Sequence, residues 1–192
     1  MILGIEIIKS YNGGVDFQDG VTRLSLKESF TSEEWSVVTA APQTVATAVM
    51  MAGFSGLGGT AKEAFSLGGS LAQGATSSSP LIREISTRDE IMAAQNALRT
   101  KTSSLDPQQF KQQLNKMAVD ESKQSLEIVG RHVTSEVEAY KQWLMDIAQR
   151  VANAAKEGGF LGFGGERVSE GERETLSLLS EALGVKVQKT SA

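Results

Sequence analysis

The stretch G-F-S-G-L-G-G occupies residues 53–59, and a closely similar stretch, G-F-L-G-F-G-G, occupies residues 159–165. Both fit the pattern G-F-x-G-[LF]-G-G, and each lies between two segments with helical periodicity. A reversal of the chain between two helices needs residues with positive φ, which glycine adopts without strain. The repeated unit of a long helix, a glycine-rich stretch and a shorter helix therefore predicts an all-α bundle of about six helices with two related helical hairpins.

The apolar residues of these two glycine-rich stretches have two possible uses. They could plug the open end of the bundle. If both stretches instead lie exposed at one end, they form an apolar patch, which is typical of an interaction site. The candidate contacts to a protein partner or to a membrane surface are then Phe54, Leu57, Phe160, Leu161 and Phe163.

The first stretch also comes close to the phosphate-binding pattern G-x-x-x-x-G-K-[ST], but Gly59 stands where that pattern has its lysine. In the second stretch Gly165 and Glu166 replace the lysine and the hydroxyl, and Glu166 would repel a phosphate. Both stretches follow a helical pattern, whereas a P-loop follows a strand. These departures argue against nucleotide binding.

The segment before the first stretch predicts a long helix from residue 31 to Gly53. It opens with the capping box T-S-E-E at 31–34 and contains Pro42, which should kink it. A shorter helix is expected at about 60–74, followed by a Ser- and Thr-rich loop at 76–80. The apolar stripe of the long helix consists of Trp35, Val38, Pro42, Val45, Val49 and Ala52.

Two further helices are expected between the hairpins. The first opens with a capping box at 87–90 and ends near residue 100. The second opens at Asp106, with Pro107 in its first turn. Its apolar stripe is interrupted by Glu121, which is explained by a helix turning towards solvent there, or alternatively by a buried acid. A break is favoured at 130–134, because one helix from 107 to 157 would be about 75 Å long, and a continuous helix is the alternative.

The segment 133–157 has the most regular periodicity of the chain, and it predicts a coiled-coil-like seam. The seam consists of Val133, Val137, Tyr140, Leu144, Ile147, Val151 and Ala154.

The final helix opens with a capping box at 169–172, presents three leucines, and stops at Gly184. Before all of these helices, residues 1–28 alternate in the manner of strands and contain two tight-turn dipeptides, which predicts a small β-like arm, with a frayed tail as the alternative. The expected organisation is therefore an arm at 1–28, a helical domain at 29–184 and a loose tail at 185–192.

Composition narrows the possible functions of this 192-residue chain. The net charge is −4 with acids and bases interspersed, which does not favour nucleic acid. There is no cysteine, which excludes disulfides and thiolate chemistry. The first residues lack a basic segment, and no run approaches the ~20 apolar residues of a membrane span. We therefore expect a cytoplasmic protein.

Residues suited to catalysis are sparse. The single histidine, His132, lacks the Glu-x-x-His spacing of di-iron bundles and is expected to face solvent at a helix junction. No G-x-S-x-G elbow is present. We expect no enzyme activity, no cofactor and no metal, and the alternative is a ligand- or metal-binding bundle that uses a buried carboxylate such as Glu121.

Two segments carry a resemblance. Residues 30–35, F-T-S-E-E-W, together with Ala41 and Pro42, resemble the opening of a group of uncharacterised, small, mostly helical bacterial proteins. Residues 158–169, G-G-F-L-G-F-G-G-E-R-V-S, resemble a segment near their C-terminal end. This resemblance implies a bacterial origin and an all-α bundle, and it implies no activity.

The sequence as a whole predicts a non-enzymatic interaction or scaffold protein that meets a partner, or its own copy in a homodimer. The surfaces expected to do so are the seam at 133–154 and the glycine-rich stretches. A peripheral membrane binder that uses the same stretches is the alternative.

Overall fold

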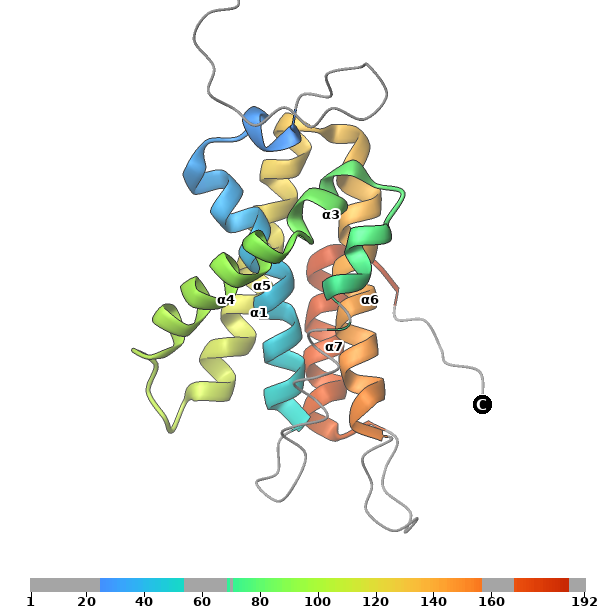
Figure 1. Ribbon diagram of the computed structural model, residues 1–192. Coiled ribbons are helices and arrows are strands. Elements are labelled where there is room, and N and C mark those ends of the chain that lie inside the picture. Colours follow the sequence, from blue (N-terminus) through green and yellow to red (C-terminus); the bar gives the residue numbers. More distant parts are fainter. Residues whose placement is uncertain (1–24, 54–68, 70, 157–167, 187–192) are drawn as a thin grey trace, which may run out of the picture.

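A computed structural model of the chain describes residues 25–53, 69, 71–156 and 168–186. These residues form helices and turns without a strand, which confirms the predicted all-α bundle (Figure 1). The described α-helices are α1 (Ser32–Gly53), α3 (Pro80–Ile85), α4 (Arg88–Thr102), α5 (Phe110–His132), α6 (Val137–Lys156) and α7 (Glu170–Leu183). Short 3-10 helices occupy Leu26–Ser29, Gln73–Thr76 and Thr134–Glu136.

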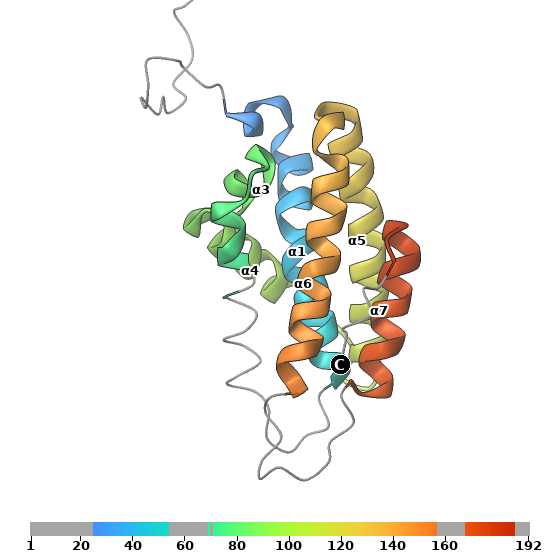
Figure 2. The same ribbon diagram turned by 90° about the vertical axis from the view of Figure 1, so that its right-hand side faces the viewer.

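Helix α1 forms the centre of the bundle. It begins with the predicted capping box, in which the Glu34 N–H donates to the Thr31 hydroxyl (3.2 Å) and the Glu34 carboxylate accepts from the Thr31 N–H (3.0 Å). It contacts α4, α5, α6 and α7, and Figure 2 shows it enclosed by its neighbours. This helix is therefore buried on most of its surface, and the apolar stripe predicted for one face includes only part of its buried residues. Its most deeply buried apolar residues are Val38, Ala41, Val45, Ala46, Ala48 and Val49.

Helices α5 and α6 are separated by the predicted break. The chain leaves helical geometry at Val133, where φ is −142° and ψ is 62°, and passes through the 3-10 turn Thr134–Glu136. The seam on α6 is then buried within the same chain, with Tyr140, Leu144 and Ile147 fully buried. This seam therefore belongs to the core of the monomer and does not offer a surface to a partner.

Helix α7 follows its sequence signals closely. Ser169 and Glu172 form a reciprocal capping box, and the helix stops at Gly184, which has a φ of 63°. The predicted leucines at 176, 179 and 183 are buried. Val185, which the sequence assigns to the loose tail, instead packs against the core, and its N–H donates to the Ser180 carbonyl (3.1 Å).

Two elements differ from the prediction between the long helices. The expected loop at 76–80 runs into α3, because Ser79 caps its N-terminus and Pro80 occupies the first turn. Helix α5 begins at Phe110 and not at Asp106. The Asp106 carboxylate accepts from the Gln108 N–H (2.9 Å), a local turn that competes with helix formation.

The predicted β-like arm lies mostly outside the described residues, as do most of the helix expected at 60–74 and both glycine-rich stretches beyond Gly53. Of the alternating residues of the arm, Leu26 lies in a 3-10 helix and not in a strand. This turn is held by the Glu84 carboxylate of α3, which accepts from the Ser25 hydroxyl and from the Leu26 N–H at 2.7 and 2.9 Å.

Two glycine-to-alanine substitutions should have opposite effects on stability. A Cβ at Gly171 would lie 2.7 Å from the Ala52 carbonyl oxygen, whereas the nearest atom to a Cβ at Gly130 is 3.8 Å away. Gly171→Ala should lower the free energy of unfolding by about 1–2 kcal/mol, because α1 and α7 must move apart. Gly130→Ala should raise it by up to about 1 kcal/mol through helix propensity. Urea unfolding of both variants measures this, and equal effects would contradict the close approach of α1 and α7.

Candidate functional site

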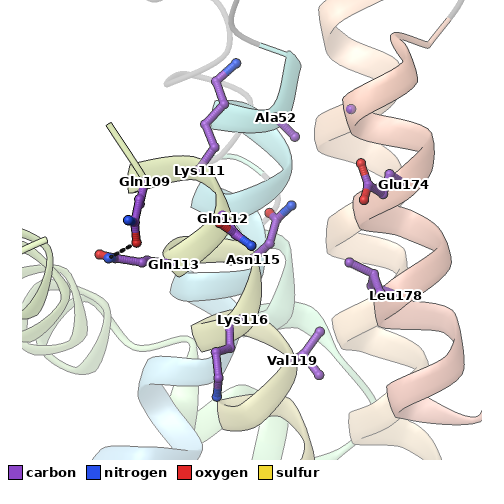
Figure 3. Close-up of a pocket in the computed structure, with 11 residues that line it drawn as sticks. Ala52, Gln109, Lys111, Gln112, Gln113, Asn115, Lys116, Val119, Glu174 and Leu178 are labelled. Atoms are coloured by element: carbon purple, nitrogen blue, oxygen red, sulfur yellow. Dashed lines mark hydrogen bonds between the residues drawn. The ribbon is translucent and has the colours of Figure 1, made fainter. Parts of the chain in front are cut away.

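A groove of about 950 Å³ lies between α5 and α7, beside the end of α1 (Figure 3). Most of its lining residues have polar side chains, and Leu178 of α7 and Val119 of α5 contribute apolar side chains (Figure 3). The lining residues are Ala52, Gln109, Lys111, Gln112, Gln113, Asn115, Lys116, Val119, Gly171, Glu174 and Leu178.

Direct contacts fix the walls of this groove relative to each other. The Asn115 side-chain amide of α5 donates to the Thr175 hydroxyl of α7 (2.9 Å). At the end of α1, Gly171 packs against the Ala52 carbonyl, and Gly53 packs against the buried side chain of Glu172. The absence of side chains on both glycines allows this packing, which sets where α7 lies beside α1.

The groove lies at the end of the bundle where both glycine-rich stretches begin. Helices α1 and α6 run in the same direction and end there, at Gly53 and Lys156, and α7 begins there (Figure 1). The predicted contact residues Phe54, Leu57, Phe160, Leu161 and Phe163 lie outside the described residues. Their positions are untested, but the helices that precede the two stretches bring their starting points to one end.

Glu121 is buried, so the prediction that its helix face turns to solvent is wrong. The residue is 8% exposed. One carboxylate oxygen accepts from the Thr44 hydroxyl of α1 (2.6 Å), and the other accepts from the Lys101 ammonium of α4 (2.7 Å). The carboxylate thus joins three helices through charge-assisted hydrogen bonds. Since both oxygens already have protein partners, this arrangement favours a structural role for Glu121 over ligand binding.

Tyr140 of α6 lies near this carboxylate and is also fully buried. Burial raises the pKa of Tyr140 well above its ordinary value, and the negative charge of Glu121 raises it further, while a hydrogen bond with Ser125 opposes the shift. The phenol therefore stays neutral and donates to the Val38 carbonyl (2.7 Å). Its hydroxyl links α6 to α1.

His132 belongs to a second charged cluster, at the opposite end of the bundle from the groove (Figure 1). Its Nε2 lies 3.1 Å from the Glu34 carboxylate, and its ring contacts Phe30. A nitrogen of Arg131 lies 3.1 Å from the same carboxylate. The pKa of Glu34 is lowered from 4.5 to about 2, first by the hydrogen bond from the Thr31 N–H and then by the hydrogen bond from His132. These residues secure the start of α1.

The groove could not be found from the sequence, because its residues have no distinctive spacing. Gln109, Gln112 and Asn115 look like the ordinary solvated face of a helix. The one local indication of the groove in the sequence is Leu178, an apolar residue next to the buried Leu179. A groove depends on how two helices approach each other, which residue spacing does not specify.

Comparisons with known proteins give no match to a family model, to a curated protein or to a solved structure. No helix within the described ranges is long and apolar enough to cross a membrane. Among the same residues, no three His, Asp or Glu side chains gather in a way that could hold a metal ion.

Replacing Glu121 should destabilise the fold more than replacing its partner Lys101. Glu121→Ala removes a buried side chain and its bonds to Thr44 and Lys101, and leaves the Thr44 hydroxyl only its bond to the Ala40 carbonyl (3.2 Å), which should cost about 2–3 kcal/mol of unfolding free energy. Lys101→Ala should cost about 1–2 kcal/mol, because its side chain is 47% exposed and water can partly replace it. Urea unfolding of the single and double variants gives the coupling energy, expected to be about 1 kcal/mol.

Lys123→Ala is the matched control for Lys101→Ala, because Lys123 is an exposed lysine on α5. Its effect should stay within about 0.5 kcal/mol. If Lys101→Ala and Lys123→Ala had the same effect and the coupling were zero, the three-helix role of Glu121 would be excluded.

The Glu34 carboxylate should make stability depend on pH. Because its folded pKa lies below its ordinary value, the ionised form stabilises the fold above pH 4.5, and this contribution is lost as the pH falls towards 2. The stability difference between the wild type and Glu34→Gln should therefore be largest near neutral pH and shrink with acidification. Urea unfolding from pH 2 to 7 measures it, with Glu33→Gln, an exposed neighbour, as the control. An equal pH dependence for both variants would refute the assignment.

Proposed function

We propose that this protein is a non-enzymatic interaction or scaffold protein that associates through the end of the bundle bearing the two glycine-rich stretches. The observation that carries the proposal is the shared direction of α1 and α6. Both helices end at the same end of the bundle, so stretches 53–59 and 159–165 both begin there (Figure 1). The groove between α5 and α7 opens beside the end of α1.

The polar groups of the core are consistent with this proposal. Glu121, Thr44 and Tyr140 bond to other groups of the protein and connect helices. His132 pairs with Glu34 at the far end of the bundle. The acidic and basic groups that the sequence offers for catalysis therefore already have structural partners, which leaves surface association as the better-supported activity.

The proposal includes two finer points that rest on the sequence. The first is that the two segments of a long helix, a glycine-rich stretch and a shorter helix are related copies of one hairpin, as the shared pattern G-F-x-G-[LF]-G-G suggests. The second is a cytoplasmic location, based on composition. If the hairpins are related, the two stretches should contribute similarly to association.

Removing the large apolar residues of one stretch should weaken association and leave folding nearly intact. Phe160→Ser combined with Phe163→Ser, and separately Phe54→Ser with Leu57→Ser, should each lower self-association about tenfold or more, because each pair removes apolar surface. Sedimentation velocity measures association, and urea unfolding measures stability. Met92→Ser, at an exposed position on α4, is the control.

The opposite pattern would overturn the assignment. If the paired serine variants lost stability while association stayed unchanged, these side chains would be part of the core that plugs the bundle. Flotation with anionic liposomes distinguishes the membrane alternative. Flotation of the wild type that the serine pairs abolish would assign the same end to a membrane surface.

A further inference from the structure

We propose that the groove between α5 and α7 is the docking site for a second copy of this chain, in a symmetric dimer whose twofold axis runs parallel to these helices. This inference rests on the proposed function, because it names the partner and the surface of self-association. Its central contact is an intermolecular pair between Lys116 and Glu174.

The charges that line the groove are separated by sign. Lys111 and Lys116 lie on α5, and Glu174 lies on α7. A twofold dimer uses the same patch on both copies, so each residue pair occurs twice. With the axis parallel to the helices, α5 of one copy lies over α7 of the other. The basic wall of each copy then meets the acidic wall of its partner, and the groove is complementary to itself.

Leu178 provides the apolar centre of this surface. It is 39% exposed, and among the described residues the other large hydrophobic side chain with such exposure is Met92 on α4. Leu178 lies on α7, one turn along the helix from Glu174, and Val119 lies on the facing helix α5 (Figure 3). An apolar centre with a polar rim is the usual anatomy of a protein interface. The dimer would cover both copies of Leu178.

The existing contact of Lys116 does not prevent this pairing. Lys116 bonds to Asp120 one turn along α5, but their side chains are 76% and 58% exposed. Exposed pairs of this kind contribute little to stability. Lys116 can therefore turn towards a carboxylate of the partner at low cost.

A twofold axis parallel to the helices also agrees with the proposal that association uses the end of the bundle where α1 and α6 end. An axis parallel to the bundle keeps the ends of α1 and α6 of both copies on the same side. The starting points of four glycine-rich stretches, two from each chain, would then lie at one end of the dimer. An axis perpendicular to the helices would send them to opposite ends.

Charge reversal tests the dimer with single variants and their mixture. Lys116→Glu alone and Glu174→Lys alone should each weaken the dimer about tenfold, because each places like charges together twice. In an equimolar mixture of the two variants, positions 116 and 174 carry opposite charges in both intermolecular pairs of the heterodimer. One pair is native and the other has its two charges exchanged. Sedimentation velocity of the full-length chains should therefore show near-wild-type affinity for the mixture, which a purely intramolecular effect could not restore.

Matched controls lie on the same two helices. Lys123→Glu and Glu181→Lys should leave the dimer unchanged, because these exposed residues do not line the groove. Leu178→Ser should weaken the dimer about tenfold, and Met92→Ser should leave it unchanged. Circular dichroism melting of each variant confirms folding.

The outcomes separate this inference from the proposed function. If the groove variants stay as dimeric as the wild type while the paired serine variants in the glycine-rich stretches dissociate, the groove is not the interface and the proposed interaction end stands. If the single reversals weaken the dimer but their mixture does not recover, the intermolecular pair of Lys116 and Glu174 is wrong. A wild type that is monomeric at every concentration overturns the dimer itself.

Discussion

Helix α1 is enclosed by α4, α5, α6 and α7, and this burial constrains the rest of the structure. Between Val38 and Val49 this helix carries mostly small apolar side chains, which allow its neighbours to approach closely. Its polar residue Thr44 is bonded, and it holds the Glu121 carboxylate that Lys101 reaches from α4. Tyr140 of α6 donates to the backbone of the same helix. The polar contacts of the core thus fix how the outer helices pack on α1.

The same packing also positions the helices around the groove, a surface for which we propose association. The end of α1 lies against the start of α7, where Gly171 meets the Ala52 carbonyl. This contact sets the separation of α7 from α5 and leaves the groove between them. The cluster around Glu121 lies in the core and the cluster around Glu34 lies at the far end, and both connect parts of the fold. We propose that association uses the end of the bundle where the two glycine-rich stretches begin.

Local signals in the sequence predicted much of this fold, whereas long-range contacts were not predictable from it. The capping boxes of α1 and α7 and the stop at Gly184 depend on residues within a few positions of each other. The burial of Glu121 depends on Thr44 and Lys101, which lie 77 and 20 residues away. The groove likewise requires α5 and α7 to meet. The predicted contact residues lie outside the described residues, so that part of the site stays a prediction.

Native mass spectrometry of the untagged wild-type chain tests the central claim most directly, which is that this bundle acts by associating and not by holding a cofactor. We predict a species of twice the mass of the chain, with no added mass. A monomer that carries an unexplained additional mass would contradict the claim. That mass would point instead to a bound ligand or metal and would identify its chemical class.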